Sequence, residues 1–309
     1  MSGTGGTSWP GRLVALGACL AIAPLQAQVR GVYPLGMSAI GSGALPDSGI
    51  TYSNLFLLYA RDQLRGADGE LLATGHNSVL MDMNTITWVS DATKIGGAHY
   101  AISVTLPFAN NSLTSDTEGA LNGGGGFADS FYQPVILGWT FARADLKVAY
   151  GFLAPTGRFD AGAADNVGSG YWTHVLSSGQ TYYLSNDRAT ALSAFEMYEF
   201  HRTQDGTGIK PGQNLDLDYS LTHLLTLRED MLLQLGLVGY SQWQTTDKRG
   251  PTVTPEQASA RYRVHAIGIG SNLHLPDRKV ILGLRYFDEF TARSTLQGYS
   301  VQISSTITF

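Results

Sequence analysis

The chain has 309 residues, a net charge of −5 and 15% charged residues, whereas soluble domains carry roughly 25%. Glycine contributes 37 residues, above the roughly 7% of an average protein. This composition argues against a uniformly water-facing surface. The chain also has no basic patch with interleaved aromatic residues, so nucleic acid is not an expected partner.

The N-terminal region has the pattern of a signal peptide. An apolar run, residues 13–25, follows Arg12 and precedes Gln26-Ala27-Gln28, which predicts cleavage after Ala27 and a signal peptide over residues 1–27. A membrane anchor is an alternative, although the run is short for a membrane span. Lipidation at Cys19 is another, but the apolar run continues past this residue. Cleavage would remove the only cysteine, leaving an exported chain without disulfides.

Residues 28–49 contain several glycines and Pro46 without a clear alternation of apolar and polar residues. Two interpretations stay open for this segment. It is either a periplasmic tether, or a plug that folds into the lumen of a barrel formed by residues 50–309.

Residues 50–309 alternate between apolar and polar residues with a period of two, which is typical of strands with two different faces. The clearest examples are His99–Phe108, Asn214–Leu224 and Gln297–Phe309. Many of the predicted strands are longer than the roughly 5–6 residues usual in globular proteins. The pattern predicts twelve strands near residues 50–61, 78–90, 97–108, 129–141, 146–157, 172–184, 190–201, 213–226, 231–245, 259–275, 279–291 and 297–309.

The connections alternate between long and short along the chain. The long ones are 62–77, 109–128, 158–171, 202–212 and 246–258, and the short ones include 91–96, 142–145 and 276–278. Long external loops and short periplasmic turns are typical of outer-membrane barrels. Because strand edges cannot remain unpaired in lipid, the strands are expected to close. The sequence therefore predicts an all-β fold, an antiparallel transmembrane β-barrel of about twelve strands.

In such a barrel the apolar face of each strand faces lipid and the polar face lines the lumen. Asp82 and Asn84 alternate with two methionines, and Asp216 and Asp218 alternate with leucines. We expect the carboxylates to face basic partners across a hydrated lumen, which would create a transverse field. The candidate lumen-lining residues are Asp82, Asn84, Asp216, Asp218, Arg261, Arg263, His265 and Arg285.

The sequence offers no catalytic or metal-binding motif. No two of the seven histidines have ligand spacing on one strand face, and no Gly-x-Ser-x-Gly elbow occurs. We therefore expect no catalytic residues, no metal and no cofactor. The rival enzyme class is a barrel lipid hydrolase, which would need a serine and a histidine close together on the lipid-facing side. His201 has no neighbouring serine of this kind.

The last segment, residues 299–309, has apolar residues at alternate positions and ends on an aromatic residue. It resembles the C-terminal targeting signal of bacterial outer-membrane proteins, with Tyr299, Ile307 and Phe309 as the signal positions. The resemblance implies that the barrel assembly machinery captures this strand by strand addition.

The middle of the chain resembles the family labelled "MetA-pathway of phenol degradation", a group of outer-membrane transporters. The resemblance rests on Gly151–Phe159, a strand end followed by a Pro-Thr-Gly turn, and on Gly236–Asp247. The loop 202–212 departs from the usual Asn/Thr/Tyr-rich turn, which leaves a substrate preference carried by that loop in doubt. The family implies passage of small, hydrophobic or aromatic molecules, and it supplies no established site.

These observations predict an outer-membrane channel or transporter, surrounded by outer-membrane lipids, for passive diffusion of small solutes. Eight-stranded barrels are filled by side chains and those of 16–18 strands enclose open channels, so twelve strands indicate a narrow lumen. The alternatives are a structural or adhesive barrel that acts through its external loops, and the lipid hydrolase.

Overall fold

The computed structural model describes residues 30–115, 119–163 and 165–309, and among these it leaves out the side chains of residues 113–122. The signal peptide expected over residues 1–27, with Cys19, lies outside the described residues. In the part of the chain that is described, no helix is long and apolar enough to cross a membrane.

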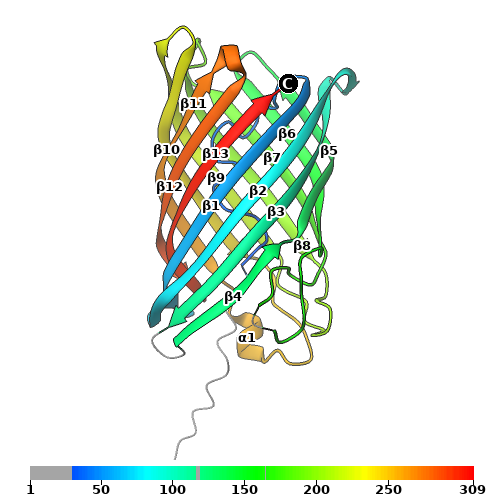
Figure 1. The fold of residues 1–309 in the computed structure, drawn as a ribbon, viewed down its shortest axis with the longest axis vertical. Helices are drawn as coiled ribbons and strands as arrows, with labels where there is room; N and C mark the ends of the chain where they lie inside the picture. Colours follow the sequence, from blue (N-terminus) through cyan, green and yellow to red (C-terminus); the bar gives the residue numbers. More distant parts are fainter. Residues whose placement is uncertain (1–29, 116–118, 164) are drawn as a thin grey trace, which may run out of the picture.

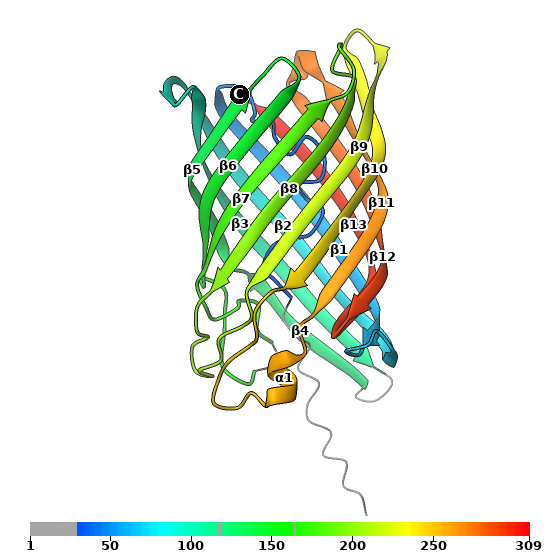
Figure 2. The same ribbon diagram turned by 180° about the vertical axis from the view of Figure 1, so that it is seen from behind.

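In the described residues, thirteen strands form one antiparallel sheet, and all except β4 (Gly119–Phe127) belong to a closed ring, which therefore has twelve strands (Figures 1 and 2). The ring closes where β1 pairs with β13, from Thr51 opposite Thr308 to Arg65 opposite Thr295. Its members are β1 (Gly49–Arg65), β2 (Leu71–Ile95), β3 (Ala98–Ser115), β5 (Ser130–Thr140), β6 (Ala144–Ala154), β7 (Thr173–Tyr183), β8 (Thr190–His201), β9 (Asn214–Arg228), β10 (Met231–Gln244), β11 (Arg263–Leu275), β12 (Val280–Arg293) and β13 (Thr295–Thr308).

The two ends of the barrel differ in their connections. The start of β1 and the chain end at Phe309 lie at the same end, together with short turns such as η1 (Pro276–Arg278). The opposite end carries the long loops and the short helix α1 (Pro255–Ser259). Thr254 caps this helix because its side chain accepts from the Gln257 amide and the Gln257 side chain accepts in return.

The predicted fold is confirmed, because each of the twelve predicted strands overlaps one strand of the ring. Two predicted long loops are wrong in part. The region 62–77 is mostly strand, since β1 continues to Arg65 and β2 begins at Leu71, and the region 109–128 contains the end of β3 and all of β4. At the start of β2 the consecutive apolar residues Leu71 and Leu72 are both exposed, so the period-two signal is lost there.

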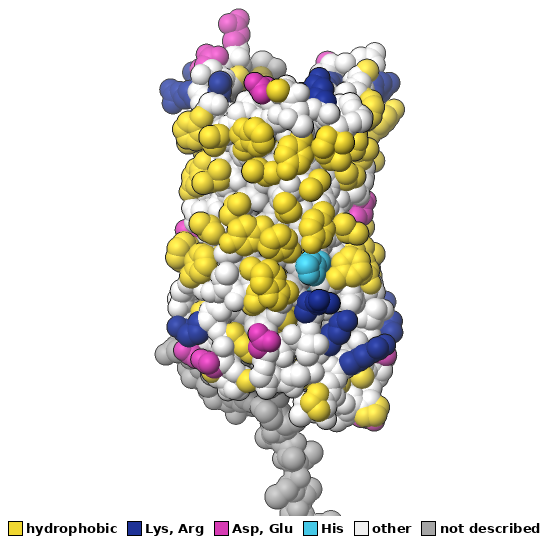
Figure 3. Space-filling model, turned by 90° about the vertical axis from the view of Figure 1, so that its right-hand side faces the viewer, with side chains coloured by type: hydrophobic (Ala, Val, Ile, Leu, Met, Phe, Trp, Pro, Cys, Tyr) yellow, Lys and Arg dark blue, Asp and Glu magenta, His cyan; other side chains and the backbone are white. Residues whose placement is uncertain are grey.

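On the face of the barrel seen in Figure 3, apolar side chains gather at mid-height and most charged side chains lie near the two ends. On β9, for example, Asp216 and Asp218 are fully buried on the inner face, while Leu221 is 46% exposed on the outer face. On β13, Gln302 is buried inside and Ile303 is 54% exposed outside. The period-two pattern therefore separates the two faces on these strands as predicted.

Residues 30–48, called the inner segment from here on, run inside the ring from the loop-rich end to the start of β1 (Figures 1 and 2). Tyr33, Leu35 and Ala39 of this segment are at most 6% exposed. They form a hydrophobic core with inward side chains of the barrel, namely Val175, Phe195, Met197, Val238, Tyr240, Val264, Ala266, Phe287 and Ala292. The inside of this barrel thus contains a core and is not lined by polar residues alone.

Candidate functional site

The inner face of β8 holds the inner segment through a single carboxylate. Glu199 accepts hydrogen bonds from the backbone amides of Val32 at 3.1 Å and Tyr33 at 2.7 Å. The Asn214 side chain donates to the same carboxylate at 2.9 Å, and the His201 Nε2 atom lies 3.2 Å from it. A buried carboxylate without partners is costly. The peptide N–H groups of the inner segment therefore stabilise Glu199, and Glu199 in turn holds the segment in place.

Asp218 on β9 also accepts hydrogen bonds from backbone amides, a few residues further along the inner segment. Its carboxylate accepts from the Gly36 amide at 2.9 Å, the Ser38 amide at 3.1 Å and the Tyr33 hydroxyl at 2.5 Å. Gly36 has a φ of +85°, and a Cβ atom there would lie 2.4 Å from the Phe287 ring. Only glycine fits this position without strain, so the local sequence and the carboxylate together fix the path of the chain.

A buried ion pair anchors the beginning of the inner segment. The Arg30 guanidinium donates to Glu289 of β12 at 2.6 Å and 3.1 Å, to the Thr295 hydroxyl at 3.1 Å and to the Leu296 carbonyl. Glu289 also accepts from the Tyr240 hydroxyl and the Gly298 amide, both at 2.9 Å. The Arg30 and Glu289 side chains are 6% and 0% exposed, so the pair is buried, and both Glu289 oxygens accept two hydrogen bonds each.

Tyr262, in the loop before β11, adds a hydroxyl contact near the Arg30 end of the segment. Its oxygen accepts from the Gly31 amide at 2.5 Å. Burial, followed by the nearby Glu199 and Asp216 carboxylates, raises the pKa of the Tyr262 phenol well above its ordinary value. The hydroxyl therefore stays protonated at neutral pH and remains a neutral partner for the backbone.

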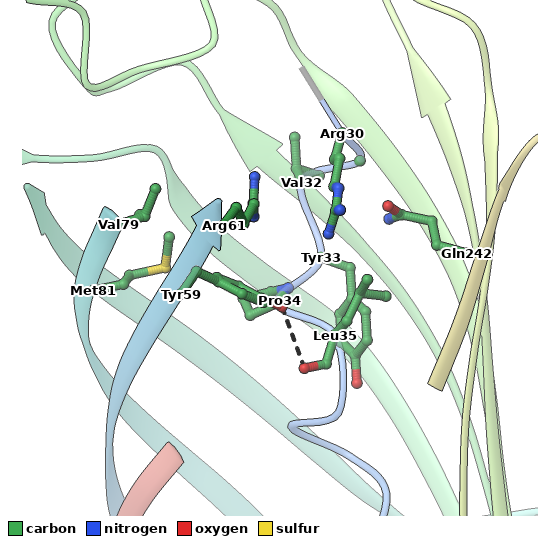
Figure 4. Close-up of a pocket in the computed structure, with 11 residues that line it drawn as sticks. Arg30, Val32, Tyr33, Pro34, Leu35, Tyr59, Arg61, Val79, Met81 and Gln242 are labelled. Carbon is green, nitrogen blue, oxygen red and sulfur yellow. Dashed lines mark hydrogen bonds between the residues drawn. The ribbon is translucent and has the colours of Figure 1, made fainter. Parts of the chain in front are cut away.

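The β1–β2 side of the lumen is different, because a small cavity separates part of the wall from the inner segment. The cavity has a volume of about 90 Å³ and is shown in Figure 4. The Tyr59 hydroxyl closes one side of it with a long hydrogen bond of 3.4 Å to the Leu35 carbonyl. Its lining residues are Arg30, Gly31, Val32, Tyr33, Pro34, Leu35, Tyr59, Arg61, Val79, Met81 and Gln242.

Of the eight residues predicted to line the lumen, Asp216, Asp218 and Arg285 lie inside the barrel and are at most 7% exposed. Asp216 Oδ1 accepts from the Gln242 amide at 2.7 Å, while its Oδ2 has no hydrogen-bond partner in the structure. The Arg285 Nε atom is likewise buried without a partner. The structure thus brings these three residues to the same lumen as the inner segment.

Asp82 and Asn84 are placed differently from the prediction, because β2 has the opposite orientation. Leu80, Ile86 and Trp88, which share their face, are 39–55% exposed, whereas the intervening Val79 and Met81 line the cavity. Asp82 accepts from the Asn54 side chain at 2.5 Å, and Asn84 accepts from the Tyr52 hydroxyl at 2.6 Å. Both residues therefore belong to a hydrogen-bonded polar cluster on the outer face.

The prediction is also wrong for the basic residues around β11. Val264 and Ala266 are fully buried in the core, which turns Arg263 and His265 to the outer face. His265 there contacts the rings of Trp243 and Phe290. Arg261 precedes β11 and forms an exposed ion pair with Asp247 at 2.8 Å. The physical reason is the core around the inner segment, which packs against Val264 and Ala266 and so fixes which face of β11 points inward.

Four residues that organise the lumen were not predicted from the sequence: Arg30, Arg61, Glu199 and Glu289. On β8 both faces carry a carboxylate, Glu196 outside and Glu199 inside, so alternation alone could not assign Glu199. Arg30 lies in a segment with no periodicity. One usable signal was that Arg30 is the single basic residue of the glycine-containing segment 28–49. If this segment entered the lumen, Arg30 would need an acidic partner on the barrel wall.

Within the described ranges, no three His, Cys, Asp or Glu side chains are grouped so that they could hold a metal ion.

Tyr299, Ile307 and Phe309 all lie on the outer face of the last strand and its end, with exposed fractions of 42%, 37% and 71%. The Phe309 amide donates to the Ile50 carbonyl at 2.9 Å, which extends the seam between β13 and β1.

Comparison with solved structures places the fold among bacterial outer-membrane barrels. The COG4313 outer membrane channel of Pseudomonas putida F1 is 13% identical, with a TM-score of 0.67, over 86% of this chain and 97% of the other. The β domain of the Bordetella autotransporter BrkA is 12% identical, with a TM-score of 0.49, over 85% and 100% of the two chains. No curated protein matches the chain.

The family comparison agrees with the resemblance noted in the sequence. The model of the family described as "Putative MetA-pathway of phenol degradation" matches residues 61–304. This range covers nearly all of the ring, from the end of β1 into β13. The chain is therefore an outer-membrane β-barrel that belongs to this phenol-degradation family.

Proposed function

We propose that this protein is an outer-membrane channel through which small hydrophobic or aromatic solutes diffuse passively. The family description and the likeness to the outer membrane channel of Pseudomonas putida support this function. The observation that carries the proposal is the occupied lumen. A ring of twelve strands, wide enough to enclose more than side chains, is narrowed by the inner segment and retains a small cavity beside it.

We further propose that the inner segment acts as a plug and not as a tether. Its backbone is held by Glu199 and Asp218, and its first described residue is held by Glu289. These contacts lie along the lumen, so the segment stands in the path of any solute. A tether would need only the covalent connection to β1 and would have no use for buried carboxylates.

Flux measurements test the channel function. Vesicles with an outer leaflet of lipopolysaccharide, which slows passive entry of aromatic molecules, should admit benzyl alcohol faster when they contain the refolded protein than when they are empty. Vesicles with the same amount of heat-denatured protein serve as the control. Flux equal to that of empty vesicles would favour a structural or adhesive barrel that acts through its loops.

We propose that the barrel is not an enzyme. One contact on its outer face bears on the alternative function, a barrel lipid hydrolase. On the outer face, the Ser241 hydroxyl and His265 Nδ1 lie 2.8 Å apart, which is hydrogen-bonding distance for a nucleophile and its base. The other ring nitrogen of His265 has no hydrogen-bond partner in the described structure, whereas an active histidine needs an orienting group. Release of fatty acids by the wild type, abolished in Ser241→Ala, would establish the hydrolase; no release supports the channel.

We also propose that β13 carries the signal read by the barrel assembly machinery. Tyr299 and Ile307 face outward on β13, and Phe309 lies just beyond the strand. These side chains form a row that a binding partner could contact while it captures the strand by strand addition. Phe309→Ala should lower the amount of barrel in the outer membrane, while the variant refolded in detergent should behave like the wild type. Equal membrane levels of the two would contradict this role.

A further inference from the structure

Among the described residues that line the cavity, Arg30 and Arg61 are basic, and Arg61 is the one that forms no ion pair with a carboxylate. It lies on β1, with its guanidinium carbon 4.6 Å from the centre of the Tyr59 ring. Its Nε atom is buried and has no hydrogen-bond partner. Arg30, the other cation of the lining, is bound to Glu289. Figure 4 shows Arg61 reaching from β1 toward the inner segment beside Val32.

Glu289 cannot serve Arg61 as a second counter-ion without losing partners that it already has. Its two oxygens accept from Arg30, the Tyr240 hydroxyl and the Gly298 amide. A buried N–H donor without a partner, such as the Arg61 Nε atom, is costly, and a planar carboxylate is the partner whose geometry matches a guanidinium. The cavity therefore presents one charge-assisted donor set for an anion from outside the chain.

The rest of the lining is suited to an organic group. Val79, Met81 and Leu35 supply apolar surface, and the Tyr59 ring supplies an aromatic face. An inorganic anion would gain nothing from these walls. Gln242, across from β1 in Figure 4, has a buried Oε1 atom without a partner, which can accept a hydrogen bond from a hydroxyl or amide on the same ligand.

The size of the cavity limits how much of a ligand fits while the inner segment is in place. An engineered apolar cavity of roughly 150 Å³ binds benzene in a protein interior, and this cavity is smaller, at about 90 Å³. The carboxylate and the first carbon atoms fit beside Arg61. An aromatic ring fits only if the wall formed by Val32, Tyr33 and Pro34 yields, so occupancy of the cavity is coupled to displacement of the inner segment.

We infer that the cavity at Arg61 is a binding site for the carboxylate of small organic acids, such as aromatic monocarboxylates. This inference rests on the proposed channel function and specifies its substrate class. Neutral aromatic molecules pass the same lumen without using Arg61, whereas acids are retained there on their way through.

Calorimetry with benzoate on the refolded full barrel tests the site. Wild type should bind benzoate, and Arg61→Met, which keeps the unbranched apolar stem, should bind it at least tenfold more weakly. Arg61→Lys should fall between the two, because lysine keeps the charge and loses the planar fork. Arg228→Met is the matched control, since Arg228 is 63% exposed at the end of β9, and it should bind benzoate like the wild type.

Benzyl alcohol flux measured on the same preparations separates this inference from the channel function. Equal benzoate binding by wild type and Arg61→Met, or no binding by wild type, would overturn the carboxylate site whether or not benzyl alcohol passes. Absence of benzyl alcohol flux in all variants would overturn the channel function, and the calorimetric comparison would still decide whether the site exists. Heat-modifiable migration in gels confirms that each variant is folded.

Discussion

The two sides of the lumen differ in how closely they contact the inner segment. On the β8–β9 side, Glu199 and Asp218 accept from the segment's backbone amides at 2.7–3.1 Å. On the β1–β2 side, the Tyr59 hydroxyl makes a longer bond of 3.4 Å, and a cavity lies beside it. The acidic side therefore holds the segment, and the β1–β2 side is where a solute can push it away. The predictions below test this difference.

The largest effect is expected from Arg30→Met, which removes one partner of a fully buried ion pair. Breaking such a pair costs about 3–5 kcal/mol, and Glu289 stays in place without its counter-ion. Amide hydrogen exchange at Val32 and Tyr33 should accelerate by at least ~100-fold, while exchange in the barrel strands should not change. Arg228→Met, which breaks an exposed pair with Asp230, should change exchange little, since exposed pairs contribute at most about 1 kcal/mol.

If exchange at Val32 were the same in Arg30→Met and wild type, the Arg30–Glu289 pair would not hold the inner segment. The β8–β9 carboxylates alone would then account for the asymmetry.

A smaller effect is expected from Gly36→Ala, with Gly41→Ala as its matched control. Both glycines have positive φ values, +85° and +66°, so alanine pays the same left-handed penalty of roughly 1–2 kcal/mol at each. Only at Gly36 does the added Cβ meet the Phe287 ring, at 2.4 Å; at Gly41 nothing lies within 4 Å. Protection of the Ser38 amide should therefore fall by about 1–3 kcal/mol more in Gly36→Ala, as measured by hydrogen exchange.

Equal loss of protection in the two alanine variants would show that Phe287 does not constrain the segment.

The smallest effect is expected from charge reversal on the outside. Arg263 lies on the outer face and Arg261 pairs with Asp247 in a loop, so Arg261→Glu and Arg263→Glu should leave the ratio of benzoate to benzyl alcohol flux unchanged. A shift of that ratio as large as the one caused by Arg61→Met would place these residues in the solute path, as the sequence alone had suggested.

Much of the fold follows from the sequence because strand periodicity and the order of long and short connections are local signals. The inner positions of Asp216 and Asp218 also follow, since residues 214–222 of β9 alternate between polar and apolar residues without interruption. Asp82 and Asn84 show where this reasoning fails. It assumes a polar lumen, and in this barrel Leu35 and its neighbours give the lumen a hydrophobic core, so Met83 turns inward at 6% exposure.

The site itself was less accessible to sequence reasoning, because it depends on contacts between distant segments. Arg30 meets Glu289 and Tyr33 meets Asp218 across long stretches of chain. Nothing in the glycine-containing segment 28–49 indicates which wall it contacts. The cavity at Arg61 was harder still to predict, because its main feature is an Arg61 Nε atom that has no hydrogen-bond partner. A sequence pattern does not reveal a missing partner.

Single-channel conductance of the full chain and of a variant lacking residues 30–45 tests the central claim most directly. These residues include the contacts to Glu199, Asp218 and Glu289, while the ring starts only at Gly49, so the variant should still fold. We predict a small conductance for the full chain and one several-fold larger for the deletion. Equal conductance of two folded barrels would contradict the conclusion that the inner segment limits passage.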